Sequence, residues 1–432
     1  MSTKDVLSKY NVEDYSDISN EGLLESAYET SEAIHSINSA LNDIDAAMDL
    51  TDSVLSIESM LAMHDLSDRE IELVNGNLKT LLLAHAGEIE NLGLESGGVA
   101  VAQKVILAVL KGTYELIKEM LVQLFQALKK FIQRMRYNLK GVRKSNNDML
   151  ETMRENSKKG LKVTKVDIEG TANSLSIDYK TPQNGEEIYK GLQTLSRYAN
   201  AYFKLFDKDV ISSSSKLISA VERFDIANPE LSLKAVLDIA DTINPNTAAD
   251  LVKSTVDKNV KMLGGGLYKK SLPLMGNRSI MYFEPYIEPS EVDLIAVSRI
   301  KRTRWANLKA TRDNPPKGSS STEIDVITVS QAAEIHRLVR DLTHMVEDHL
   351  DNRDKILKLE RSINRALDKM KSRSESSSDI SEKGKRHYQE VMRYSQRYIF
   401  WAQNPQMELV KLILSSCRSA IVACNKSAAV YG

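Results

Sequence analysis

The stretch Ile335-His-Arg-Leu338-Val-Arg-Asp-Leu342-Thr-His-Met345 opens the most regular pattern in the chain. From here to Met370 the seam positions recur in steps of three and four residues, which places one stripe along a helix. The pattern predicts a helix over residues 329–371 that packs against partner helices. Two polar residues, His349 and Asn352, occupy the seam, where such a pair fixes register at some cost in stability.

A second long helix is predicted over residues 99–153. Its seam keeps the same alternation and comprises Leu110, Tyr114, Ile117, Leu121, Leu124, Leu128, Phe131 and Met135. Charged residues from Lys104 to Glu119 interrupt the window of about 20 apolar residues that a bilayer requires, so no integral membrane segment is expected. We expect the apolar seam to be buried against partner helices. The alternative is an amphipathic helix at a membrane surface, which is suggested by the basic residues Lys129, Lys130, Arg134, Arg136, Lys140, Arg143 and Lys144.

The rest of the chain is also rich in helix formers, with only nine Pro among 432 residues. We therefore predict a mainly α fold, an elongated helical bundle with long heptad-patterned helices. Two segments change period and predict a small β-hairpin or sheet element in the middle, at about 161–180 and 270–284. Further helices are predicted over residues 186–224, 229–243, 248–263, 382–402 and 406–430.

Charge divides the chain into two opposed parts. Residues 1–95 hold 20 acidic and four basic residues, which gives −16, whereas the remaining 39 acidic and 54 basic residues give +15. Such an asymmetry of charge indicates what the protein binds and says little about how it folds. We predict an acidic helical prodomain over 1–95, a basic core over 96–314, a linker over 315–328 and a C-terminal helical bundle over 329–432.

The boundary between these charges is Leu92-Gly93-Leu94-Glu95-Ser96-Gly97-Gly98. Its glycines weaken helix and leave an extended segment that a protease groove accepts. Leu92, Gly93 and Glu95, followed by Ser96, resemble the substrates of the prohead proteases of T-even-like tailed phages. The alternative is a helix C-cap with Gly93 in a left-handed conformation.

Several features together extend this resemblance to most of the chain. They are the acidic N-terminal part, the Gly-x-Glu-Ser junction, the basic amphipathic helix after it, the turn Pro273-x-x-Gly276-Asn277-Arg278 and the helical C-terminal region. In this arrangement the chain resembles the internal head proteins of large T-even-like tailed phages. The resemblance implies a structural protein made in the host cytoplasm, incorporated in the prohead core with capsid and core proteins, and trimmed by the maturation protease.

The densest basic stretch comprises Arg299, Lys301, Arg302, Arg304, Lys309 and Arg312, with Trp305 among them. It predicts non-specific contacts with the phosphates of packaged DNA and an aromatic ring for stacking. The alternative is a solvated face with Trp305 as a core anchor. Once the acidic residues 1–95, with their charge of −16, have been removed, the basic part is suited to neutralising phosphates inside the capsid.

Motifs of enzymes and cofactor sites are absent from the sequence. Gly264-Gly265-Gly266 lacks the spacing of a phosphate-binding loop, and His344 and His349, five residues apart, do not share a helix face. We therefore expect no enzyme, metal or cofactor, and we expect Cys417 and Cys424 to be reduced core residues. Two alternatives are an ejected virion protein that acts on host membrane or partners through residues 99–135, and a cellular coiled-coil adaptor that is not processed. Self-association through the heptad seams fits each of these hypotheses.

Overall fold

The computed structural model describes residues 99–225, 227–241, 266–285, 293–303, 307–312, 322–376, 382–402 and 404–431. The predicted acidic prodomain and the predicted helix over 248–263 lie outside these ranges. Within them, the predicted mainly α fold is confirmed.

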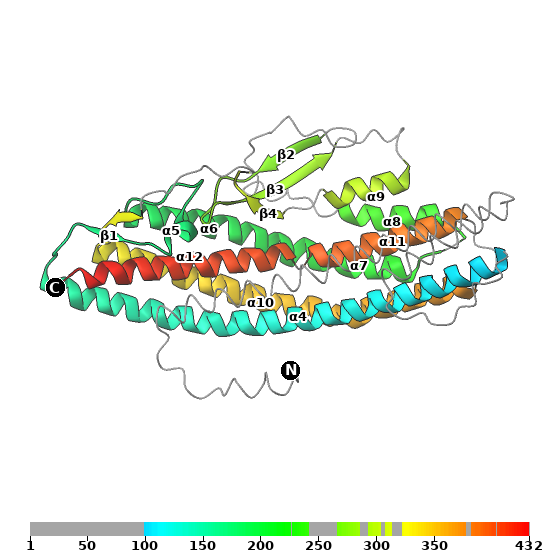
Figure 1. Cartoon of the computed structure of the whole chain (residues 1–432), viewed down its shortest axis with the longest axis horizontal. Helices are drawn as coiled ribbons and strands as arrows, with labels where there is room; N and C mark the ends of the chain where they lie inside the picture. The colour runs from blue at the N-terminus through cyan, green and yellow to red at the C-terminus, as the bar shows by residue number, and fades with distance from the viewer. Residues whose placement is uncertain are drawn as a thin grey trace.

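Three long helices form the length of an elongated bundle: α4 (Val99–Asn156), α10 (Val329–Ser376) and α12 (Asn404–Ala429) (Figure 1). α4 packs against both α10 and α12. The shorter helices α6 (Gly185–Leu205), α7 (Ile211–Glu222), α8 (Pro229–Asp241), α9 (Leu294–Thr303) and α11 (Glu382–Trp401) complete the bundle. Because α4 lies before residue 314 and α10 after 328, the predicted basic core and C-terminal bundle share one apolar core.

The apolar surface of α10 is wider than the predicted two-position seam. Ile335 and Leu342 are fully buried, as the heptad predicts, whereas Leu338 and Met345 are half-buried. Val339 and Val346, which the heptad leaves outside the seam, are fully buried. The reason is that α10 is packed between α4 and the pair α6 and α7, so it needs a broad apolar face and not a single stripe.

The polar residues of the α10 seam meet a polar partner on a neighbouring helix. A π-helical turn, Phe206–Val210, joins α6 to α7 and carries Asp207. Asn352 donates a hydrogen bond of 2.8 Å to Asp207, and the ring of His349 lies 3.9 Å from the same carboxylate. His349 is buried and stacks on Phe203 with ring centroids 3.9 Å apart. These contacts are available in one register of α10 against α6 and α7.

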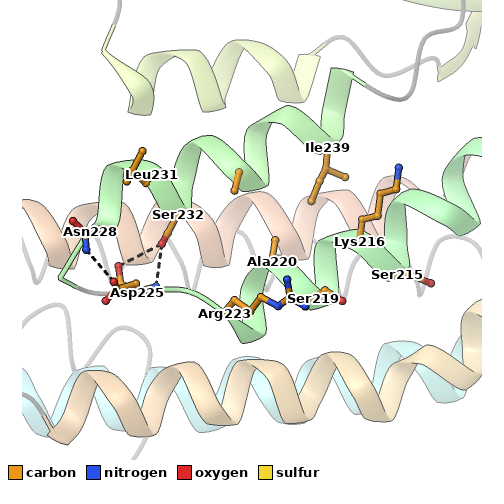
Figure 2. Close-up of a pocket in the computed structure, with 11 residues that line it drawn as sticks. Ser215, Lys216, Ser219, Ala220, Arg223, Asp225, Asn228, Leu231, Ser232 and Ile239 are labelled. Atoms are coloured by element: carbon orange, nitrogen blue, oxygen red, sulfur yellow. Dashed lines mark hydrogen bonds between the residues drawn. The ribbon is translucent and has the colours of Figure 1, made fainter.

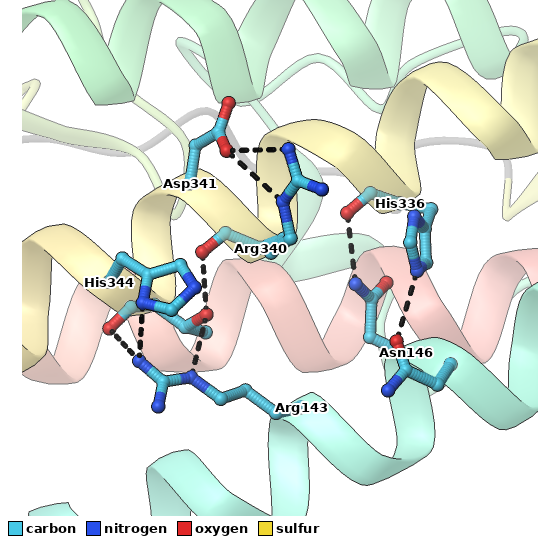
Figure 3. A network of polar contacts seen from close by, with 8 residues as sticks. Arg143, Asn146, His336, Arg340, Asp341 and His344 are labelled. Atoms are coloured by element: carbon cyan, nitrogen blue, oxygen red, sulfur yellow. Dashed lines mark hydrogen bonds and ion pairs between the residues drawn. The ribbon is translucent and has the colours of Figure 1, made fainter.

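A second polar contact fixes α4 against α10 (Figure 3). The guanidinium of Arg143 donates hydrogen bonds to the carbonyl and the hydroxyl of Thr343 and to the carboxylate of Glu347. One turn further along α4, the amide of Asn146 donates to the carbonyl of His336 over 2.9 Å. The α4–α10 interface therefore combines buried apolar residues with a set of directional bonds.

The predicted β element is present, but its pairing differs from a local hairpin over 161–180. Strand β1 (Lys165–Asp167) pairs antiparallel with β5 (Glu323–Asp325), a segment far along the chain. Residues that a hairpin would need for its second strand form the short helix α5 (Ala172–Leu175), because Gly170 turns the chain with a φ of +85°. Consequently the predicted linker over 315–328 ends in a strand, with Ile324 and Ile327 buried.

The strand predicted after the turn at Gly276-Asn277 is confirmed, whereas its partner strand ends at Lys270, where the predicted segment 270–284 begins. β2 (Gly266–Lys270) and β3 (Arg278–Pro285) are antiparallel, and β4 (Asn307–Ala310) extends the sheet on the other side of β3. Gly276 has a φ of +66°, and a Cβ there would lie 2.8 Å from the side chain of Leu412 on α12. The turn therefore requires glycine for its conformation and for its contact with the bundle.

Candidate nucleic-acid interface

The predicted basic stretch is divided between two elements. Arg299, Lys301 and Arg302 belong to α9, whereas Lys309 lies on β4 and Arg312 just after it. Arg304 and Trp305 lie outside the described residues, as does the side chain of Arg302. The structure therefore places four of the seven predicted side chains.

The two side chains placed on α9 make contacts within the protein. The Nζ of Lys301 is buried and donates to the carbonyl oxygen of Leu237 on α8 over 3.3 Å. The Nε of Arg299 lies 3.7 Å from the carboxylate of Glu390, a residue of α11 that is only 5% exposed and also accepts a hydrogen bond from Ser298. These contacts connect α9 to the helices beside it.

Arg312 is paired as well. Its Nε and Nη2 donate to the two carboxylate oxygens of Asp178 at 2.8 Å and 2.5 Å, a bidentate arrangement. Hydrogen bonding from this guanidinium lowers the pKa of Asp178 and keeps it ionised. Lys309 lies on β4, and its side chain is exposed. The described part of the stretch thus offers fewer open cations than the sequence implies.

A larger exposed basic surface lies on α4, and we call it the α4 basic face. It comprises the exposed residues Lys129, Lys130, Arg134, Lys140 and Lys144. With about 100° of rotation per residue, these side chains fall within an arc of roughly 140°. The opposite side of the helix is buried in the bundle through Phe131, Met135, Leu139 and Val142.

All the charged residues in the part of α4 that carries the α4 basic face are basic. Residues 120–147 contain seven basic residues and no acidic one. Two of the seven, Arg136 and Arg143, lie at the edge next to α10, where they pair with Asp351 at 2.8 Å and Glu347 at 2.7 Å. Each of these two carboxylates of α10 is therefore paired with an arginine at the edge of the α4 basic face.

An aromatic side chain lies within this surface. Tyr137 is 48% exposed and falls between the lysines and arginines in the helical arrangement. An exposed ring among cations suits a polyanion that also carries stackable bases. In the sequence, these basic residues suggest the alternative at a membrane surface and also, together with the stretch at 299–312, contacts with nucleic acid once the acidic part is removed. The lack of acidic residues over 120–147 is the sequence feature that distinguishes this surface.

The described part of the chain offers no arrangement of side chains for binding a metal ion. Among these residues, no cluster of three or more His, Cys, Asp or Glu side chains is arranged to hold a metal ion. His344 is exposed beside Arg143, whereas His349 is buried against Phe203, so the two histidines face different surroundings. None of the described helices is both long enough and apolar enough to span a bilayer.

The two cysteines lie in the core of α12. Cys417 and Cys424 are fully buried and free, as predicted, and burial raises the pKa of each thiol to about 12. Neither thiol is therefore a nucleophile at neutral pH.

The predicted cleavage residues Leu92, Gly93, Glu95 and Ser96 lie outside the described residues. The helix that follows them begins at Val99, directly after the glycines of the junction.

Comparison with known proteins identifies a family. The family model of phiKZ-like phage internal head proteins matches residues 29–426. No curated protein and no solved structure matches the chain. The matched range includes the α4 basic face, the small sheets and the junction at residue 95.

Proposed function

This chain belongs to the phiKZ-like phage internal head proteins, structural proteins of the capsid interior, and we propose that it enters the prohead core as a precursor, is trimmed after Glu95 and is packaged with the DNA. The class expected from the sequence, an internal head protein of large phages, is confirmed, although the matching family is that of phiKZ-like phages and not of T-even-like ones. The family favours this function over a cellular coiled-coil adaptor.

The observation that carries the proposal is the position of the charge boundary relative to the fold. The acidic residues that give −16 precede Ser96, and the basic surface on α4 begins about 30 residues later on a helix that starts at Val99. One cut at the junction would separate the two without dividing any described helix or strand. The product would carry +15 and keep the whole described bundle.

Packaged DNA supplies the reason for trimming. Densely packed phosphates repel an acidic protein, and cationic side chains that contact them release condensed counterions. We assign this contact to Lys130, Arg134, Lys140 and Lys144 of the α4 basic face, which surround the exposed ring of Tyr137. Lys309 on β4 is a further exposed cation from the stretch that the sequence predicted.

Mass mapping of the protein from mature particles tests the trimming. The N-terminal peptide is expected to begin at Ser96, with no peptide from residues 1–95 retained. Recovery of the intact chain from mature particles would contradict the proposal.

The fate of the protein on infection separates packaging from an ejected effector. A structural role in the capsid predicts that the trimmed protein stays in emptied particles. Its loss with the DNA would favour the alternative in which α4 acts on host membrane or partners.

A further inference from the structure

A groove of about 710 Å³ runs between α7 and α8, on a part of the bundle remote in sequence from the α4 basic face (Figure 2). Its α7 side is lined by Lys216, Ser219, Ala220 and Arg223, which recur at the spacing of one helix face. The small side chains of Ser219, Ala220 and Ala235 keep the groove open between the two helices.

The two sides of the groove differ in chemistry. The α7 side presents two exposed cations, Lys216 of α7 and Arg223 directly after its last residue, seven positions apart. The α8 side presents apolar surface through Leu231, which is 69% exposed, with Ala235 and Ile239. The groove therefore has one basic edge and one apolar edge.

The carboxylate at one end of the groove is already engaged. Asp225 accepts hydrogen bonds from the backbone of Ala227 and from the amide of Asn228, and its own backbone N–H donates to Ser232. These bonds hold the loop that leads into α8 (Figure 2). Asp225 keeps its negative charge while it holds the loop, so with Lys216 and Arg223 the ionised residues that line the groove sum to +1, and the groove favours an acidic ligand.

We propose that this groove binds the acidic amphipathic segment at residues 34–52 of the same chain. That segment has an apolar stripe at helical spacing, formed by Ile34, Ile37, Leu41, Ile44 and Met48. At about 100° per residue, Asp45, Asp49 and Asp52 fall together along one edge of the stripe. An apolar stripe with one acidic edge is complementary to a groove with one apolar and one basic edge.

The spacing of the charges agrees as well. Asp45 and Asp52 are seven residues apart, as are Lys216 and Arg223, so two ion pairs can form at once between parallel or antiparallel helices. The apolar stripe would then cover Leu231 and Ala235. This inference deepens the proposed function, because it gives the acidic part a docking place on the bundle that trimming would free from its tether.

Cross-linking within the full-length chain tests the docking. Leu41→Cys is combined with Ala235→Cys, which lies in the groove, or with Lys234→Cys, the adjacent exposed residue of α8 that does not line it. The native thiols at Cys417 and Cys424 are buried and leave the new pair as the reactive one. A short bismaleimide should cross-link the Ala235 pair within one chain several times faster than the Lys234 pair.

Charge reversal tests the basic edge. Adding Lys216→Glu and Arg223→Glu to the Ala235 pair should slow cross-linking by roughly tenfold at low salt, because two exposed ion pairs can no longer form. Lys158→Glu with Lys162→Glu makes the same charge change outside the groove and should leave the rate unchanged.

Three results would overturn the inference. They are equal rates for the two cysteine pairs, no response to Lys216→Glu with Arg223→Glu, or a product that joins two chains in mixtures of tagged and untagged protein, which would assign the groove to a second copy. The measurement uses unprocessed protein, so its failure leaves the test of cleavage after Glu95 unaffected.

Discussion

The amide of Asn352 on α10 donates a 2.8 Å hydrogen bond to the carboxylate of Asp207, which lies on the π-helical turn between α6 and α7. His349, one turn earlier on α10, is buried next to the same carboxylate. A π-helical turn within an α-helical segment commonly marks a position of special function. Here it presents an acidic side chain to the two polar residues that interrupt the seam, and so specifies one register.

Removing this carboxylate should destabilise the bundle. We expect Asp207→Ala to lower the free energy of unfolding by about 1–3 kcal/mol, because the hydrogen bond that Asn352 donates to this carboxylate would be lost. Denaturant titration measures this, and Asp238→Ala, at an exposed carboxylate of α8, is the control. In a double-mutant cycle with Asn352→Ala, a coupling energy near zero would contradict the register role.

Arg143 gives a second prediction, at the interface between α4 and α10. Arg143→Ala removes the bonds to Thr343 and Glu347 across this interface and should cost about 1–3 kcal/mol of unfolding free energy. Lys140→Ala, an exposed residue of the same helix, should change stability by less than about 0.5 kcal/mol. Equal effects for the two would show that the Arg143 bonds add nothing to the packing.

The long helices could be predicted from sequence because their information is local. The three- and four-residue alternation reports which side of a helix is apolar, and α4, α10 and α11 begin within one residue of the predicted starts. The number of packed neighbours is not local. Val339 and Val346 of α10 are buried because α10 has neighbours on more than one side, which no heptad records.

The candidate site shows the same limit. Pairing of β1 with β5 joins residues about 160 positions apart, and nothing near Val166 in the sequence indicates Ile324 as its partner. Likewise, Arg312 reads as an open cation in sequence, but its partner Asp178 is brought to it by the fold. Local density of basic residues therefore does not show which cations of the Arg299–Arg312 stretch are paired within the protein, whereas the seam through Phe131 and Met135 already indicates in the sequence which side of α4 is buried.

Stability should depend on pH through His336. Burial, with the nearby Arg340 and Arg154, lowers the pKa of His336 below its unfolded value of about 6.5. The neutral ring is therefore favoured in the folded state, so its contribution is fully present above pH 6.5 and is lost as pH falls through the folded pKa. Thermal unfolding from pH 7 to 5 should show a smaller loss of stability for His336→Gln than for the natural chain. His344→Gln, at a largely exposed ring, is the control, and identical pH profiles for all three would contradict the prediction.

Processing should require the residues at the junction. Gly93→Trp or Glu95→Lys should block trimming in infected cells while leaving the unfolding transition unchanged, because the glycine-rich sequence of the junction is typical of an accessible segment between folded parts. Gel mobility of the protein from purified particles reports the trimming. Normal trimming of both variants would show that the protease does not recognise Gly93 and Glu95.

The central claim is that trimming leaves a basic protein whose α4 basic face binds DNA phosphates. The most direct test is the salt dependence of its binding to duplex DNA, measured by fluorescence anisotropy. Residues 96–432 should bind duplex DNA without sequence preference, and the full-length chain should bind weakly at every salt concentration. Replacing Lys130, Arg134, Lys140 and Lys144 by Gln should reduce the slope of log affinity against log salt by about 0.9 for each phosphate that is no longer neutralised. Arg299→Gln with Lys309→Gln should change it less. An unchanged slope for the α4 variant, or equal binding by the trimmed and full-length proteins, would contradict the account.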